Sequence, residues 1–91
     1  MFPKVVQVIP MKNYCVYVYF EDGKIVCYDM SSMIEKESFR PLREIQVFME
    51  TCTVMNDTLA WDISRNRDNA MCLDIDPDTL YELPLAKEKI A

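Results

Sequence analysis

Four cysteines are the residues in this chain whose types could do nucleophilic or metal chemistry: Cys15, Cys27, Cys52 and Cys72. The chain contains no histidine, so it lacks the usual general base near neutral pH and the commonest metal ligand. The cysteines form no closely spaced pair, whereas structural zinc sites are built from such pairs. All four stand among apolar neighbours, where a free cysteine behaves as a small hydrophobe. We therefore predict buried thiols, with no bound metal or cofactor.

A run of aspartates near the C-terminus is the sharpest candidate for a metal site. Residues 74–78 carry aspartate at every second position, the spacing that begins a calcium loop. The pattern then fails, because the sixth position is Thr79 where glycine is needed and the twelfth is Leu85 where glutamate is needed. The same residues suit a strand end followed by a helix with Asp76 as its N-cap and proline at its first position. We predict a short C-terminal helix near 77–82.

The composition excludes several other functions. A single glycine cannot form a glycine-rich phosphate loop, and no nucleophile-elbow motif is present. We therefore predict that the protein is not an enzyme. Fifteen acidic against ten basic residues give a net charge of −5, which disfavours direct nucleic-acid binding. No apolar run is long enough to span a bilayer, and residues 1–4 lack the apolar region of a signal peptide, so a cytoplasmic protein is expected.

The rest of the chain is organised around a predicted β-hairpin at residues 14–29. Its residues are β-branched or aromatic, and Asp22-Gly23 is a favoured two-residue loop. That loop would place Phe20 opposite Ile25. Alternation then assigns one apolar set to the core face and one aromatic set to the other face. The core set is Val16, Val18, Phe20, Ile25 and Cys27, and the other set is Cys15, Tyr17, Tyr19, Val26 and Tyr28.

The remaining elements are predicted from their flanking signals. A short helix capped by Ser32 precedes a second helix near 42–49, whose apolar stripe comprises Leu42, Ile45, Phe48 and Met49. Further strands are expected at 4–9, 52–56, 58–62 and 70–75. An Asn-Asp turn at 56–57 joins the second and third of them, and a polar loop is expected at 64–69. We predict one α+β domain, residues 1–91, with a frayed tail from about 85. An antiparallel sheet of about five strands, with the hairpin 14–29 central, is covered by the two helices near 42–49 and 77–82.

Tyrosines on the predicted hairpin give a candidate interface. Tyr17, Tyr19 and Tyr28 would share one face, and aromatic rings with hydroxyl tips suit partial burial. Either helices or chain ends cover this face, or it meets an external partner. Trp61 is the lone tryptophan and is a second candidate, either as a binding anchor or as a core residue.

Several stretches together resemble a known family. They are Pro3 with Val5 and Val8, residues 20–23 leading to Tyr28 and Asp29, Phe39 and Leu42 followed by Phe48, and Trp61 and Asp62 followed by residues 73–82. In this order they resemble a small bacterial family catalogued as domain of unknown function 2442, from which the loop 63–69 departs in length. The resemblance implies an α+β domain, often encoded beside another small protein as in toxin–antitoxin pairs. It implies no catalytic residues.

The expected function is therefore a non-catalytic protein-binding module, an antitoxin-like partner of the neighbouring gene's product. Three alternatives stay open. The first is a homodimer formed through Tyr17, Tyr19 and Tyr28. The second is a small-ligand pocket between the helix near 42–49 and the sheet. The third is an accessory domain in transcriptional regulation.

Overall fold

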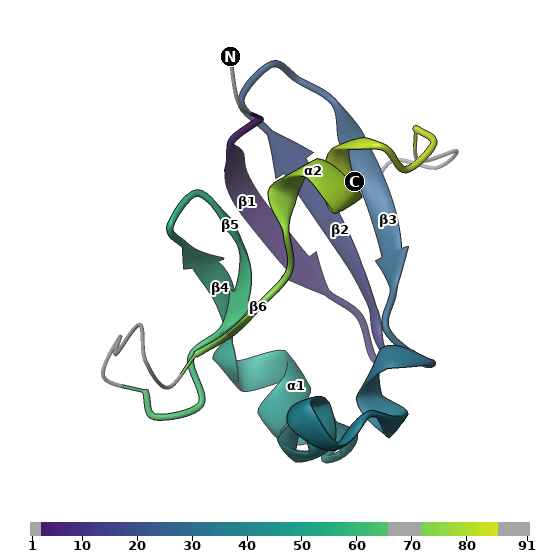
Figure 1. Cartoon of the computed structure of the whole chain (residues 1–91), viewed down its shortest axis with the longest axis vertical. Coiled ribbons are helices and arrows are strands. Elements are labelled where there is room, and N and C mark those ends of the chain that lie inside the picture. Colours follow the sequence, from purple (N-terminus) through teal and green to yellow (C-terminus); the bar gives the residue numbers. More distant parts are fainter. Residues whose placement is uncertain (1–2, 66–71, 86–91) are drawn as a thin grey trace.

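Two three-stranded antiparallel sheets make up most of the fold (Figure 1). The computed structural model describes residues 3–65 and 72–85. The first sheet has the order β1 (Val5–Pro10), β2 (Cys15–Phe20), β3 (Ile25–Asp29). The second has the order β4 (Cys52–Met55), β5 (Thr58–Trp61), β6 (Leu73–Asp74). Between the sheets run two 3₁₀ helices, η1 (Met33–Glu35) and η2 (Glu37–Arg43), then α1 (Ile45–Thr51), while α2 (Pro77–Tyr81) follows β6.

The predicted α+β class is confirmed, but the single sheet of about five strands is wrong. β1 is the edge of the first sheet, and its pairing with β2 is interrupted at Val6, where the register shifts between Val5 and Gln7. Such a bulge increases the local twist and breaks the ladder. The second sheet meets β1 through a backbone hydrogen bond from the Val5 N–H to the Asp57 carbonyl, 2.9 Å long. The hairpin therefore supplies two strands of a small sheet and is not the centre of a larger one.

The hairpin loop has three residues, not the predicted two. The Phe20 N–H donates to the Lys24 carbonyl at 2.9 Å, and the Gly23 N–H donates to the Phe20 carbonyl at 3.0 Å. This is a turn followed by a residue with positive φ, here Gly23 at 95°. The extra loop residue shifts the register by one, so Val18 pairs with Val26. A shift of one residue exchanges the two faces of β3.

The core face of β3 was therefore predicted wrongly. Val26 and Tyr28 point toward the core, whereas Ile25 and Cys27 point away from it. The assignment of β2 was right, since Val16, Val18 and Phe20 are all buried.

Replacing Gly23 with alanine is expected to destabilise the protein by about 1–2 kcal/mol, because an L-residue with a Cβ is strained at positive φ. No atom lies within 4 Å of the added Cβ, so a steric clash contributes nothing. Urea denaturation measures the effect. Asparagine tolerates positive φ better than alanine, so Gly23→Asn is the control, and an equal loss in both variants would contradict backbone strain as the cause.

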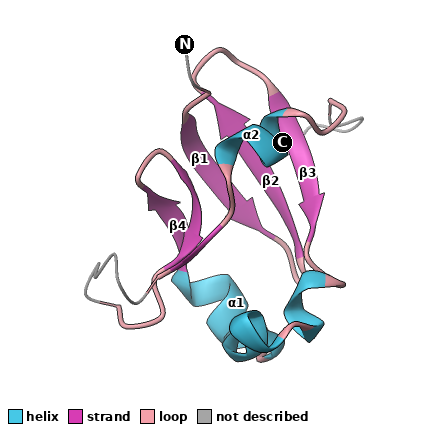
Figure 2. Ribbon diagram, viewed as in Figure 1, coloured by secondary structure: helices cyan, strands magenta, loops and turns pink. Residues whose placement is uncertain are grey.

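Aromatic contacts join the helices to the sheets. The Phe48 ring of α1 packs edge-on to Tyr14, with centroids 5.2 Å apart, and against Trp61 at 5.5 Å. Figure 2 shows α2 lying across the first sheet, where Tyr81 meets Phe20 edge to face at 5.0 Å. Helices and the second sheet thus cover one side of the first sheet. The fully buried side chains of this core include Trp61, Phe48, Met30, Leu42, Leu59, Leu80, Val16, Val18 and Val26.

The middle helix begins later than predicted. Residues 37–43 form a 3₁₀ helix that contains Pro41, and Glu44 is extended, so α1 begins at Ile45. Leu42 and Phe48 of the predicted stripe are nonetheless buried. The capping box at Ser32 is absent, since this side chain makes no cap hydrogen bond and η1 is a single turn.

The predicted turn between β4 and β5 and the predicted C-terminal helix are confirmed. Asn56 and Asp57 form the β4–β5 turn, both with positive φ. At α2, the Asp76 side chain accepts a hydrogen bond from the Asp78 N–H at 3.0 Å. Leu85, where the tail was predicted to fray, forms an antiparallel bridge with Val26. Most of the predicted loop 64–69, the start of the strand predicted at 70–75, and the tail beyond Leu85 lie outside the described residues.

Candidate functional site

The side of the first sheet that points away from the core carries mainly apolar side chains. We call it the outer sheet face. Side-chain alternation and the observed register place nine residues on or beside it: Val6, Gln7, Ile9, Cys15, Tyr17, Tyr19, Ile25, Cys27 and Asp29. None of them is buried, and Val6 is 56% exposed. None belongs to the core cluster or to the side chains packed against it.

Two rows of cross-strand neighbours form the middle of this face. Ile9 pairs with Tyr17, which pairs with Cys27, and Gln7 pairs with Tyr19, which pairs with Ile25. Facing side chains in such pairs have Cβ atoms about 4.5–5.5 Å apart, so each row is a continuous contact. Tyrosine is enriched at protein interfaces because its large apolar ring ends in a polar hydroxyl. The face thus has the composition of an interface with two adjacent tyrosines at its centre.

The structure separates the four predicted interface residues. Tyr17 and Tyr19 lie together on the outer sheet face. Tyr28 lies on the opposite side, packed against the core, and its burial raises the pKa of its phenol above the ordinary value. Trp61 is completely buried, and its indole N–H donates to the Phe48 carbonyl at 3.1 Å. Only two of the four therefore share a surface, and the register error explains the misplacement of Tyr28.

The cysteines are free thiols, but they are not the buried thiols predicted. Cys27 is exposed and the other three are partly exposed. Cys15 and Cys27 lie on the same face, again contrary to the prediction. Burial, followed by the Asp29 carboxylate and the Cys27 thiol, raises the pKa of Cys15 to about 11, and burial raises the pKa of Cys52 to about 12. A high pKa keeps both thiols protonated and weakly nucleophilic near neutral pH.

Alkylation by iodoacetamide should follow these differences. At pH 8 we expect Cys27 to react first because it is exposed. A pKa of about 12 leaves roughly one Cys52 thiol in ten thousand ionised at that pH, so Cys52 should react slowest. Its thiolate fraction, and hence its rate, should rise about tenfold for each pH unit until the pKa is reached. Peptide mass mapping measures the rates, and equal rates for Cys27 and Cys52 would contradict this order.

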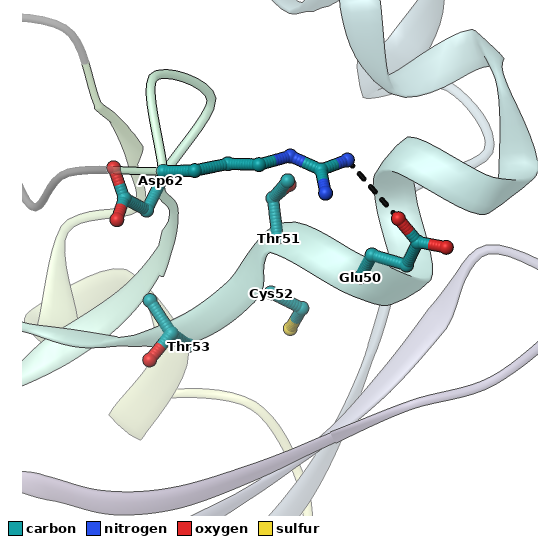
Figure 3. Close-up of a pocket in the computed structure, with 6 residues that line it drawn as sticks. Glu50, Thr51, Cys52, Thr53 and Asp62 are labelled. Atoms are coloured by element: carbon teal, nitrogen blue, oxygen red, sulfur yellow. Dashed lines mark hydrogen bonds and ion pairs between the residues drawn. The ribbon is translucent and has the colours of Figure 1, made fainter.

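A polar pocket of about 320 Å³ lies where α1 passes into β4 (Figure 3). It is lined by Glu50, Thr51, Cys52, Thr53, Asp62 and Arg65. The dashed line in Figure 3 marks the ion pair of Glu50 with Arg65, 3.0 Å long, and the Asp62 carboxylate points away from this pair. Asp62 accepts a hydrogen bond from the Ser64 hydroxyl at 3.2 Å, and Thr51 donates to the Val47 carbonyl. These side chains have partners within the chain, which is typical of a structural junction.

A larger and more apolar groove lies between the β1–β2 turn and α1. Its volume is about 570 Å³, and it is lined by Lys12, Ile45, Gln46, Met49 and Glu50. Ile45 and Met49 stand one turn apart on α1 and give it an apolar side. The small-ligand pocket was predicted between this helix and the sheet, whereas the groove lies between the helix and Lys12 of the β1–β2 turn.

Residues 3–65 and 72–85 contain neither a cluster of potential metal ligands nor a helix that could span a membrane. No group of three potential ligands in this part of the chain could hold a metal ion. The aspartates that resemble a calcium loop include Asp76, which caps α2. No helix in the same part of the chain is long and apolar enough to cross a membrane.

Comparison with known proteins gives one match. The family model described as "Protein of unknown function (DUF2442)" matches residues 5–84. Neither a curated protein nor a solved structure matches the chain.

Proposed function

Because the chain belongs to the family described as Protein of unknown function (DUF2442), we propose a function from the geometry: a non-catalytic protein-binding domain that recognises its partner through the outer sheet face. An antiparallel sheet that packs one face on the core ordinarily turns polar side chains to water on the other. Here that other face carries Ile9, Tyr17, Tyr19 and Ile25. A contiguous apolar surface on an exposed sheet face supports an interaction site there. This is the observation that carries the proposal.

The side chains that could support catalysis favour the same conclusion. The chain has no histidine. The raised pKa values of Cys15 and Cys52 oppose a nucleophilic role for either thiol. In the polar pocket, Glu50 forms an ion pair with Arg65, and Asp62 accepts a hydrogen bond from the Ser64 hydroxyl.

The charge of the chain indicates the kind of partner. Its net charge of −5 would favour association with a basic protein, because complementary charge speeds encounter and suppresses wrong partners. In the antitoxin-like form of the proposal, this partner is the product of the neighbouring gene.

Size-exclusion chromatography and calorimetry with the purified neighbouring gene product test the proposal. We expect a complex at micromolar concentration. Tyr19→Ala should weaken it at least about tenfold, the effect of losing a central aromatic anchor. Ser38→Ala, at an exposed position of η2, is the control and should bind normally. The absence of a complex at micromolar concentration would remove the proposal.

A small-ligand-binding domain is the second candidate, because the groove at Ile45 and Met49 has a volume typical of ligand pockets. Fragment screening by NMR tests it, with shifts expected at Gln46 and Met49. Shifts confined to other residues would exclude it. Self-association through the outer sheet face stays a prediction, tested by light scattering at high concentration.

A further inference from the structure

We propose that the occupant of the outer sheet face is a single amphipathic α-helix of the partner, with apolar side chains on one side and lysine or arginine on the other. This inference rests on the proposed protein-binding function and specifies the partner's structure. Three observations on the face support it: its dimensions, its composition and its charge.

The dimensions of the face match one helix. Three strands at about 4.8 Å spacing make it roughly 14 Å wide with its side chains. From Cys15 to Tyr19, a distance of four residue steps along β2, it extends about 13 Å. An α-helix with its side chains is about 10–12 Å in diameter and rises 1.5 Å per residue, so nine or ten residues of one helix cover this length.

The same dimensions argue against a second copy of the chain as the occupant. A patch of about 14 by 13 Å is well below the roughly 800 Å² per partner of a standard stable interface. Two copies would also bring together two net charges of −5. A helix that belongs to a larger partner can add contacts beyond the patch, whereas a symmetric dimer formed through this face alone cannot.

The spacing of the tyrosines on the outer sheet face is close to the spacing of side chains in an apolar stripe on a helix. Tyr17 and Tyr19 lie about 6.6 Å apart along β2, close to the 5–6 Å that separates residues three or four apart on a helix surface. Ile9 and Ile25 flank this pair on β1 and β3. An apolar stripe of three or four side chains can therefore rest on the tyrosines with the isoleucines on either side.

The charges of the face favour a basic helix. The positions of the outer sheet face include no lysine or arginine, and Asp29 is their only charged residue. The Ser31 N–H donates to Asp29 Oδ1 at 2.9 Å, which keeps the pKa of Asp29 below its ordinary value and the carboxylate ionised. Lys24, which directly precedes Ile25, turns to the opposite side of the sheet, where its ammonium donates to the Tyr81 carbonyl and lies 4.3 Å from the centroid of the Tyr81 ring. A cation on the flank of the helix would thus meet Asp29 without repulsion.

Selection from a displayed peptide library tests the inference on the full chain. Each 14-residue peptide has a helical stripe of leucine, isoleucine, phenylalanine or methionine, and its polar positions are drawn from lysine, arginine, glutamate, aspartate, serine and glutamine. We expect enriched peptides to be rich in lysine and arginine, to become helical on binding as measured by circular dichroism, and to shift the amide signals of Tyr17, Tyr19 and Ile25.

Matched variants locate the site. Tyr19→Ala should weaken the best peptide at least about tenfold. Asp29→Asn, which retains the acceptor for Ser31, should weaken it two- to fivefold at low salt and reduce its salt dependence. Ser38→Ala, at an exposed position of η2, should leave binding unchanged.

Four outcomes would overturn the inference: no enrichment of any peptide, enrichment of peptides whose polar positions are acidic, binding of the peptides as extended strands, and amide shifts confined to the groove at Met49. If the neighbouring gene product still binds in a Tyr19-dependent manner, the proposed function stands and only the helix assignment is lost. If neither that product nor any peptide binds, both are lost.

Discussion

Replacing Trp61 with alanine should lower the free energy of unfolding by about 3–5 kcal/mol, the range for removal of a large aromatic side chain from a core. Trp61 is 0% exposed and packs against Phe48 with ring centroids 5.5 Å apart. Its indole N–H also donates to the Phe48 carbonyl, which would lose this donor. Small domains are stable by only about 5–15 kcal/mol in total, so this one side chain accounts for a large share.

Denaturation followed by circular dichroism measures the loss. Each kcal/mol corresponds to about 4–8 °C in the midpoint of a domain of this size. Trp61→Phe should recover part of the stability, because a ring still fills the site next to Phe48. Val6→Ala, at a side chain 56% exposed, is the control and should change stability by less than about 0.5 kcal/mol. A loss below about 1 kcal/mol in Trp61→Ala would mean that Trp61 is a surface anchor after all.

Local signals in the sequence were sufficient where backbone chemistry determines the structure. Asn56 and Asp57 both tolerate positive φ, and they form the predicted turn. Asp76 has a side chain that caps a helix end, and the helix begins at the next residue. Leu42 and Phe48 are apolar at helical spacing, and both are buried although the extended residue Glu44 divides the predicted helix.

The register of the hairpin could not be fixed by the same reasoning. Gly23 supplies positive φ equally well as the second residue of a two-residue loop and as the last residue of a three-residue loop. The sequence around Asp22 and Gly23 is compatible with both. Tertiary packing decides between them, because it places Val26 among the core side chains. Tyr28 was consequently assigned to the wrong side of the sheet.

The division into two sheets depends on contacts between distant residues. The pairing of β5 with β6 joins residues 60–61 to 73–74, and the Val5–Asp57 hydrogen bond joins the chain's first strand to the β4–β5 turn. Neither has a local signal. Of the outer sheet face, Tyr17 and Tyr19 were predictable from alternation along β2, whereas Ile25 required the correct register. Ile9 could also have been assigned to this face, because it is apolar and its neighbour Val8, on the same predicted strand, points to the opposite side.

Replacing Val26 with aspartate should cost about 4 kcal/mol or more and prevent stable folding, because it places a carboxylate in a fully apolar core. Val26 is 0% exposed and pairs with Val18, which is also fully buried. The same substitution at the adjacent residue, Ile25→Asp, should cost less than about 1 kcal/mol, because Ile25 lies on the outer sheet face and water can solvate the new charge.

The two variants differ by one position along the same strand, so β-propensity and net charge change equally in both. Urea denaturation measures them. The two-residue loop would turn Ile25 inward and reverse their order, and this reversal would contradict the observed register. Ile25→Asp also serves the functional proposal, since a folded domain with a carboxylate beside Tyr19 should lose its partner. A folded Ile25→Asp variant that binds the neighbouring gene product normally would show that the partner contacts another surface.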